Sequence, residues 1–395
     1  MRRRRRSLTP FLILLLPVLL VLGVWLGGHP DSLPEPVRDV LVSESDGRTY
    51  EEAIDTLSRD YYREVDRKQL LDRSLEHAVD SLDDRFSHYF PPRDYADFQQ
   101  ATEGRFEGVG MTVEEIERGL RVITVYDGSP ADRGGLKPGD VVTEVDGRSI
   151  AGASSEESTT RIKGPAGTAV RLTVRSGGRT RELRLERASV EIPVVESELR
   201  TVGGAKVAHV SLSSFTSGAH GAVGEAVRGL LKDGAEGVVL DLRDNGGGLL
   251  NEAVLVSSIF IPDGRIVSTK GRSRPEQVFE ATGGAIDADV PVVVLVNGNS
   301  ASASEIVTGA LQDRDRATVV GTKTFGKGVF QEVEPLSNGG ALDITVGEYF
   351  LPSGRNLGGG GVQRGAGVAP DVRAQDDPDT PRRDEALQAA LQEVV

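Results

Sequence analysis

The segment VVVLVNGNSASASEI, residues 292–306, predicts the fold of the larger part of the chain. Its first five residues are all aliphatic, which is typical of a strand buried on both faces of a sheet. Asn-Gly-Asn then predicts a tight turn, and the spacing of Ser302 and Glu305 matches a capping box that begins a helix. We expect Ser302 at the junction of strand and helix, above the sheet. A serine that only caps its helix is the alternative.

The flanking sequence continues this alternation of strands and helices. Residues 206–212 and 237–242 have the composition of strands, and residues 219–232 and 249–259 have the periodicity of helices. Strands that alternate with helices indicate an α/β core in which helices pack on a sheet. We place this core at residues 189–375.

The rest of the chain divides into segments of different composition. Ahead of the core, glycine-rich turns separate short strands, which predicts a β-rich domain that follows a helical region. We assign, in chain order, an apolar segment at residues 1–28, a proline-containing tether at 29–46, the helical region at 47–103, the β-rich domain at 104–188 and, beyond the core, a C-terminal helix at 376–395.

The N-terminal segment has the pattern of an export signal. Five arginines at positions 2–6 precede an uncharged apolar run at residues 11–26. As a helix, residues 11–28 would be roughly 27 Å long, close to the thickness of about 30 Å of a bilayer's hydrocarbon core. We predict a signal-anchor that inserts into the membrane and leaves the body of the chain extracytoplasmic, in the cell envelope or outside the cell. A cleaved signal with a secreted body is the alternative.

The composition excludes several classes of site. The chain has 46 basic and 60 acidic residues among 395, a formal charge of −14, so we predict no nucleic-acid partner. It has no cysteine, which excludes thiol nucleophiles, disulfides and thiolate metal sites. We assign no metal ligands and no cofactor. Any covalent catalysis must therefore use an oxygen or nitrogen nucleophile.

Two motifs in the β-rich domain indicate peptide binding. FEGVGM, residues 106–111, places small residues where successive backbone N–H groups could turn inward and bind a carboxylate, and GLKPGD follows further along. With these motifs the domain resembles the PDZ domains of bacterial proteases. The resemblance implies that a peptide C-terminus binds at Gly108, Val109, Gly110 and Met111. The alternative is that these glycines only form the turns of a β-rich domain.

Ser302 needs a base before it can act as a nucleophile. None of the five histidines is well placed to act as the general base for Ser302. Three of them lie in the tether and the helical region. His209 is a core-facing residue of a predicted strand, and His220 is near the start of a helix. Lys327 lies between two glycines just before a predicted strand, where its side chain could turn into a cleft, although most lysines are only solvated. The same stretch nearly matches a phosphate-binding loop, but Gly328 stands where Mg²⁺ needs a hydroxyl, so we exclude an NTPase.

Three motifs together resemble the carboxyl-terminal processing peptidases, the tail-specific serine proteases of family S41. They are SASASE at residues 300–305, TFGKG at 324–328 with Gln331 beyond it, and DLRDNGGG at 241–248. The resemblance implies an α/β protease core with a mixed sheet and an inserted PDZ domain. It also implies a Ser–Lys dyad, with Ser302 as nucleophile, Lys327 as general base and Gln331 as the residue that orients the lysine.

The chemistry of such a site makes further demands. A lysine with an ordinary pKa near 10.4 is almost fully protonated at neutral pH, so burial must lower the pKa of Lys327 substantially. The tetrahedral oxyanion needs two fixed donors, for which we predict the backbone N–H groups of Gly247 and Ala303. Direct contact between Lys327 and Gln331 requires a turn, because four residues of regular strand span about 13 Å.

We therefore predict a serine endopeptidase that recognises the C-terminal region of exported proteins, binds polypeptides with free C-termini and cleaves them nearby. The alternative is a PDZ scaffold without catalytic activity that binds protein C-termini. Apolar helix faces of the helical region and the terminal helix must be covered, either by subunit contacts in a homodimer or by each other within one chain. These faces contain Ile54, Leu57, Tyr61, Ala386, Leu387, Ala390 and Leu391.

Overall fold

The computed structural model describes residues 45–377, 379–380 and 383–395. These residues form two units, one that ends at Asp83 and one that begins at Asp84. The predicted signal-anchor and most of the tether lie outside the described residues. Within the described part of the chain, no helix is long and apolar enough to span a bilayer.

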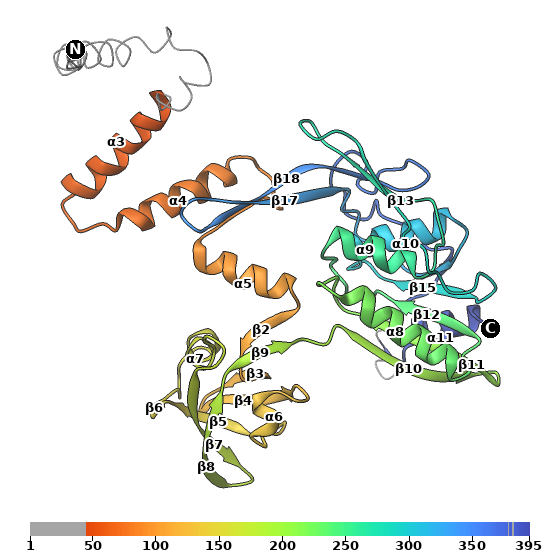
Figure 1. Cartoon of the computed structure of the whole chain (residues 1–395), viewed down its shortest axis with the longest axis horizontal. Helices are drawn as coiled ribbons and strands as arrows, with labels where there is room; N and C mark the ends of the chain where they lie inside the picture. Colours follow the sequence, from red (N-terminus) through yellow and green to blue (C-terminus); the bar gives the residue numbers. More distant parts are fainter. Residues whose placement is uncertain (1–44, 378, 381–382) are drawn as a thin grey trace, which may run out of the picture. The chain divides into compact units, whose positions relative to one another are not determined.

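The first unit contains two helices, α3 (Ser45–Asp60) and α4 (Arg67–Asp80) (Figure 1). Ile54 on α3 is buried, so part of the predicted apolar face is covered within the unit. Leu57 and Tyr61 are 48% and 51% exposed. The expectation that a second copy of the chain covers these two side chains stays a prediction.

The α/β core is built on a six-stranded sheet with the strand order β10-β11-β12-β15-β16-β19. Its strands are β10 (Val195–Val202), β11 (Ala205–Leu212), β12 (Gly237–Asp241), β15 (Val292–Val296), β16 (Thr318–Gly321) and β19 (Val372–Arg373). β10 pairs antiparallel with β11 and all other neighbours pair in parallel, so the predicted mixed sheet is confirmed. The core helices are α8 (Ala219–Lys232), α9 (Leu250–Ser258), α10 (Ala303–Asp313) and α11 (Glu385–Glu393).

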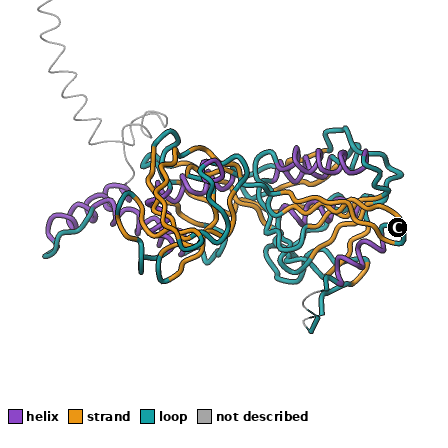
Figure 2. Tube along the Cα trace, turned by 90° about the horizontal axis from the view of Figure 1, so that it is seen from below, coloured by secondary structure: helices purple, strands orange, loops and turns teal. Residues whose placement is uncertain are grey.

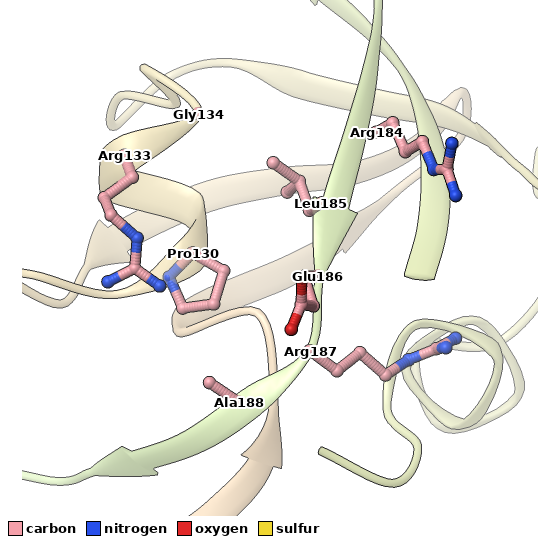
Figure 3. A pocket seen from close by; sticks show the side chains of 8 residues that line it. All are labelled: Pro130, Arg133, Gly134, Arg184, Leu185, Glu186, Arg187 and Ala188. Atoms are coloured by element: carbon pink, nitrogen blue, oxygen red, sulfur yellow. The ribbon is translucent and has the colours of Figure 1, made fainter. Parts of the chain in front are cut away.

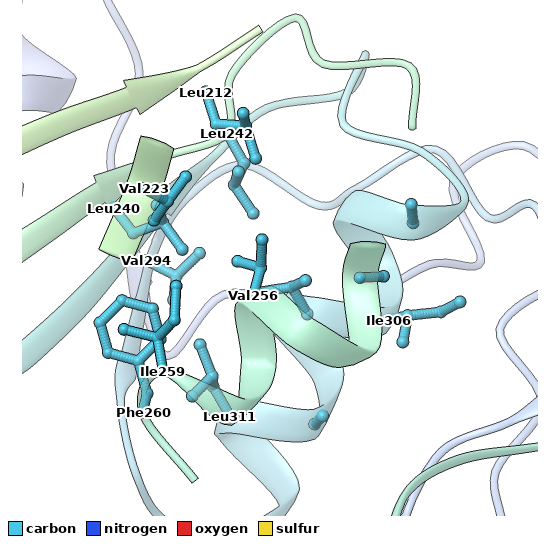
Figure 4. Packing of buried hydrophobic residues seen from close by; sticks show 14 of the residues in the cluster. Leu212, Val223, Leu240, Leu242, Val256, Ile259, Phe260, Val294, Ile306 and Leu311 are labelled. Carbon is cyan, nitrogen blue, oxygen red and sulfur yellow. The ribbon is translucent and has the colours of Figure 1, made fainter. Parts of the chain in front are cut away.

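The two faces of this sheet bury different side chains, because successive strand residues point to opposite sides. Val292 and Val294 of β15 belong to the large apolar cluster with α8, α9 and α10, part of which Figure 4 shows. Val293 and Leu295 belong to a second cluster with α11. Figure 2 shows the core strands with helices on either side.

The apolar stripe of α11 is covered by the chain's own sheet. Its four predicted members are all buried, and they pack against aliphatic residues of four strands, Val207, Val239, Val293, Leu295 and Val320. The stripe is covered within one chain, but by the sheet and not by the N-terminal helical region, and the expected subunit contact at this stripe is wrong. The sheet can cover both sets of helices because its central strands are aliphatic on both faces.

A second sheet carries the segment that contains Lys327. It has the order β1-β18-β13-β14, and β17 also pairs with β18. Its strands are β1 (His88–Phe90), β13 (Arg265–Lys270), β14 (Gln277–Glu280), β17 (Val329–Pro335) and β18 (Ala341–Phe350), and α5 (Pro92–Thr102) follows β1. Lys327 comes just before β17.

The β-rich domain has its own sheet and apolar core. Its elements are β3 (Met111–Ile116), β4 (Gly119–Val125), α6 (Pro130–Arg133), β5 (Val141–Val145), β6 (Arg148–Ser149), α7 (Ser155–Ile162), β7 (Ala169–Ser176) and β8 (Arg179–Glu186). Two antiparallel strands, β2 (Arg105–Gly108) and β9 (Ala188–Glu191), carry the chain into and out of this domain.

Candidate active site

Ser302 lies at the carboxyl edge of the core sheet, between β15 and α10. Its backbone has φ 55° and ψ −114°, a region that residues other than glycine rarely adopt. A conformation of this kind costs about 1–3 kcal/mol and persists only where the surroundings hold it. An ordinary N-cap serine has an extended backbone. The alternative that Ser302 only caps its helix therefore does not account for its conformation.

The buried carboxylate of Glu305 holds Ser302 in place. Its Oε2 accepts hydrogen bonds from the N–H groups of Ser302 and Lys327, both at 2.9 Å. Its Oε1 accepts from the Gly326 N–H at 2.7 Å and the Thr324 hydroxyl at 2.6 Å. Burial raises the pKa of Glu305, and these four donors act in the opposite direction. From the sequence Glu305 is predicted only as a capping residue, because no local pattern indicates that it joins two distant segments.

The Lys327 side chain reaches Gln331. Its Nζ donates to Gln331 Oε1 at 2.7 Å and lies 4.5 Å from the centre of the Phe86 ring. Gln331 Nε2 in turn donates to Thr345 Oγ1 at 2.9 Å. The contact forms because Lys327 precedes the strand and the register of β17 shifts between Phe330 and Gln331.

The surroundings of Lys327 favour its neutral form. Burial lowers the pKa of this lysine, while the carboxylates of Asp343, Asp84 and Glu305 raise it and the Arg85 guanidinium lowers it. Burial has the largest effect, so the pKa lies below that of an exposed lysine. This is the direction that a general base requires.

Tyr349 of β18 is a second residue that the sequence analysis missed. Its phenol is buried near the Ser302 side chain; this neighbour lowers the pKa of Tyr349, but burial has the larger effect and raises it to about 12. Its backbone N–H donates to the Gly328 carbonyl at 2.9 Å. Across the described residues, no hydrogen bond joins Lys327 Nζ to Ser302 Oγ. No local pattern around Tyr349 identifies it, because only the pairing of β18 brings it to this position.

The two residues expected to form the oxyanion hole lie together. A Cβ atom on Gly247 would be 2.9 Å from Ser302 Cβ and 3.0 Å from the Ala303 nitrogen, and Gly247 has φ 107°. The Gly247 N–H donates to Asn245 Oδ1 at 2.9 Å. Asn245 is itself fully buried and donates to the Leu212 carbonyl. In the structure the Gly247 N–H group is therefore engaged with Asn245, and its role as an oxyanion donor stays a prediction.

Beside this loop, an ionic cluster ties the core to the C-terminal helix. The Arg243 guanidinium donates to both carboxylate oxygens of Asp384, at 2.8 and 2.9 Å, and to Asp241. Asp384 is also the N-cap of α11, where it accepts from the Leu387 N–H. His209 Nε2 lies 3.2 Å from Asp241 Oδ2 and the His209 side chain is 12% exposed, so this strand histidine is part of the ionic cluster.

The predicted peptide-binding loop connects β2 and β3. The carbonyl of Val109 accepts from the Ala131 N–H at 2.7 Å, and that of Gly110 accepts from the Ser129 hydroxyl at 3.1 Å. A Cβ atom on Gly110 would lie 2.2 Å from Ser129 Cβ, so only glycine fits. Gly108 ends β2 and Met111 begins β3. Both carbonyls therefore point towards the domain's own backbone.

A cavity of about 370 Å³ lies elsewhere in this domain, between α6 and β8 (Figure 3). It contains Arg133, Arg184 and Arg187, together with Glu186. Arg187 is already engaged with three backbone carbonyls. None of the residues predicted to act in catalysis or peptide binding lines this cavity.

Comparison with known proteins gives matches over most of the chain. The sequence profile of Peptidase family S41 matches residues 206–374, and that of the PDZ domain matches residues 108–186. The chain is 35% identical over 312 residues to the carboxy-terminal-processing protease of Bartonella bacilliformis, covering 78% of this chain and 70% of that protein. It is 34% identical over 328 residues to a probable CtpA-like serine protease of Staphylococcus aureus, covering 82% of this chain. The aligned part spans 63% of the length of the S. aureus protein.

Two solved structures are similar along most of their length. The photosystem II D1 C-terminal processing protease is 31% identical, with a TM-score of 0.50 and coverage of 84% of this chain and 88% of that one. A putative S41 protease from Bacteroides fragilis has a TM-score of 0.52 at 18% identity and covers 86% of this chain and 96% of its own. The second match shows a shared fold.

Proposed function

Because the chain belongs to the carboxy-terminal-processing proteases of peptidase family S41, we propose that it is a serine endopeptidase that cuts polypeptides near their C-termini. The observation that carries the proposal is the position of Glu305. One oxygen of this buried carboxylate accepts from the backbones of both Ser302 and Lys327. Nucleophile and base are thus held by a single fixed group.

The first half of the reaction transfers the substrate's acyl group to Ser302. Neutral Lys327 Nζ accepts the proton of the Ser302 hydroxyl while Oγ forms a bond to the carbonyl carbon. The carbonyl oxygen becomes an oxyanion, which the N–H groups of Gly247 and Ala303 stabilise. Because the Gly247 N–H donates to Asn245 in the free protein, that donor must turn towards the oxyanion. Lys327 must likewise turn from Gln331 towards Ser302.

The second half regenerates the enzyme. The Lys327 ammonium returns its proton to the leaving nitrogen as the C–N bond breaks, which frees the C-terminal fragment as an amine. Water then attacks the Ser302 ester with Lys327 again as base, and the proton passes to Ser302 Oγ as the ester bond breaks. Gln331 keeps the lysine aligned through both halves, and Thr345 supports Gln331.

The PDZ domain supplies recognition of the substrate's end. We assign the loop of Gly108, Val109, Gly110 and Met111 to binding a free C-terminal carboxylate. Support comes from the carbonyls of Val109 and Gly110, which face the domain's own backbone. An unblocked tail adds as a strand beside β3 in the usual mode of peptide binding by PDZ domains.

The basic and apolar N-terminal sequence supports an extracytoplasmic place of action. Five arginines followed by an uncharged apolar run of signal type predict export, with retention as a membrane anchor. Substrates would then be exported proteins. A homodimer that covers Leu57 and Tyr61 is the accompanying proposal for assembly.

A serine-directed covalent probe tests the catalytic assignment. Residues 45–395 and the Ser302→Ala variant are incubated with a fluorophosphonate, and the adduct is located by mass spectrometry. We expect one adduct on Ser302 and none in the variant. The Ser304→Ala protein serves as the matched control and should be labelled, because Ser304 donates to the Asn245 carbonyl inside the core. Labelling of Ser302→Ala would exclude Ser302 as the nucleophile.

A further inference from the structure

Two arginines lie over the ring of Phe325, and one of them, Arg85, also lies over the Phe86 ring that contacts Lys327. The Arg85 Cζ atom lies 4.6 Å from the centre of the Phe86 ring and 5.3 Å from that of Phe325. The Arg364 Cζ atom lies 5.7 Å from the Phe325 ring. Both guanidinium groups are exposed, and among the described residues neither forms an ion pair with a carboxylate.

Arg85 stands on a turn that is fixed by hydrogen bonds. Asp84 accepts from the Phe86 N–H at 3.1 Å and from the Ser87 hydroxyl at 2.7 Å. Ser87 Oγ accepts in turn from the Thr345 N–H at 3.0 Å. Thr345 is also the residue that receives the hydrogen bond from Gln331. The turn that carries Arg85 is therefore attached to the strand that supports the lysine.

Arg364 comes from a different segment, which is paired with the residues around Lys327. The Gly365 N–H donates to the Phe325 carbonyl at 2.7 Å, and the Gln363 N–H donates to the Gly326 carbonyl at 3.2 Å. Two separate parts of the chain thus bring a cation to the same ring. The aromatic faces hold both guanidinium groups while leaving their N–H groups available for a further ligand.

The position of these arginines relative to Lys327 identifies the part of the substrate that they meet. Lys327 Nζ and Arg85 Cζ lie 4.5 and 4.6 Å from the same Phe86 ring centre, so they are at most about 9 Å apart, the length of about three extended residues. The base that takes the Ser302 proton also protonates the leaving nitrogen, so the departing C-terminal segment lies on the lysine's side. An extended segment that leaves Lys327 would bring its second or third residue after the cut bond within reach of Arg85.

We propose that Arg85 and Arg364 form a subsite that binds a carboxylate of the departing segment, within about three residues after the cleaved bond. The carboxylate is either an acidic side chain or the substrate's own terminal group. The protein is acidic, with a net charge of −14, so an unpaired cationic site beside the base would attract an anionic tail that the rest of the surface repels. This inference rests on the proposed function and names a preference of that same site.

The test compares peptides that differ by one charge. Two substrates carry Glu or Gln at the third residue after the cleaved bond, with the same free C-terminus several residues later, so that capture by the PDZ loop is equal. Cleavage positions are fixed by mass spectrometry of the products. We expect the Glu peptide to have a kcat/KM about three- to tenfold higher at low salt, mostly through KM, and the ratio to fall at high ionic strength.

Variants of the chain locate the effect. In Arg85→Gln and Arg364→Gln the ratio should fall, and in the double variant it should be one, while the exposed Arg228→Gln on α8 keeps the full ratio. Binding of both peptides to Ser302→Ala gives the same comparison without turnover. Shorter peptides that end at the third residue, as acid or amide, show whether the terminal carboxylate also occupies the subsite.

Two outcomes overturn the subsite. Equal kcat/KM values for the Glu and Gln peptides with the unaltered chain would reject it, and so would arginine variants that slow both peptides by the same factor. Labelling of Ser302 by the fluorophosphonate is independent of these ratios. Failure of the subsite with labelling intact therefore leaves the protease assignment standing, whereas loss of labelling rejects the assignment itself.

Discussion

Ser302 and Lys327 donate their backbone N–H groups to the same oxygen atom, Oε2 of Glu305, each at 2.9 Å. They are 25 positions apart in the sequence, and one carboxylate fixes the starting point of both side chains. The strained backbone of Ser302 is held in the same way. Several measurable consequences follow from this arrangement.

Replacement of Glu305 should separate the two residues. In Glu305→Gln an NH₂ group replaces one carboxylate oxygen. Each oxygen of Glu305 accepts two hydrogen bonds, and an NH₂ group cannot accept them, so two of the four bonds are lost. Each buried N–H left without an acceptor costs about 1–3 kcal/mol, and thermal unfolding should shift accordingly. We expect kcat to fall about 100-fold or more while peptide affinity of the PDZ domain is unchanged, as measured by steady-state kinetics and peptide titration. The exposed Glu276→Gln is the control; a similar loss there would contradict the assigned role.

The activity should rise with pH through the deprotonation of Lys327. Its pKa is lowered by burial, so the neutral base becomes abundant below the pH at which an exposed lysine titrates. The expected profile of kcat/KM increases from neutral to mildly alkaline pH. Lys327→Ala and Lys327→Arg should each lose about 10²–10⁴-fold, because arginine does not deprotonate at usable pH. An arginine variant with substantial turnover would eliminate the dyad.

Tyr349→Phe removes one hydroxyl that faces Ser302 and keeps the ring beside Phe330. We expect a several-fold lower kcat with an unchanged KM, since the serine hydroxyl loses a polar neighbour. Burial raises the pKa of Tyr349 to about 12, so the phenol stays protonated across the working pH range. The variant should therefore keep the pH profile of the unaltered chain. A displaced profile would mean that Tyr349 itself titrates in the reaction.

Two neighbouring glycines allow a matched comparison at the oxyanion site. In Gly247→Ala the new methyl group would lie 2.9 Å from both Ser302 Cβ and the Ala301 carbonyl oxygen, at a φ of 107°. We expect a loss of about 10²–10³-fold in kcat, the usual effect of losing one oxyanion donor. Gly246→Ala has open space around it and should retain nearly full activity. Equal kcat values for the two variants would argue against Gly247 as a donor.

The contact between Arg243 and Asp384 should contribute to stability. A double-mutant cycle with Arg243→Gln and Asp384→Asn, followed by chemical unfolding, should give a coupling energy of about 0.5–3 kcal/mol. The exposed pair of Arg314 and Asp263 should give at most about 1 kcal/mol. If both pairs gave the same small value, the C-terminal helix would be held by its apolar stripe alone.

Local patterns were sufficient for the elements around the site. The aliphatic run at residues 292–296 and the capping spacing of Ser302 and Glu305 predicted a strand, a turn and a helix, and the structure has β15 and α10 there. The position of α8 at Ala219–Lys232 also agrees with its periodicity. These signals are local because hydrogen bonding and side-chain periodicity within one element produce them.

Contacts between segments were harder to predict. Glu305 accepts hydrogen bonds from a segment about 20 residues further along the chain. Tyr349 comes near Ser302 only because β17 pairs with β18. Neither contact can be predicted from the residues on either side of Glu305 or Tyr349. The engagement of the Gly247 N–H by Asn245 depends on the conformation of a glycine-rich loop, which the sequence leaves free. The residues proposed to carry the chemistry were predicted from the resemblance, and their supporting contacts required coordinates.

The burial of α11 determines how firmly the second face of the core sheet is closed. Here the final helix is packed on the core sheet as far as Val394, which is 5% exposed, and its first turn is fastened through Asp384 to Arg243. Helix α11 cannot leave the sheet without exposing the aliphatic side chains of four strands to water. Release of this helix and loss of the core should therefore occur together.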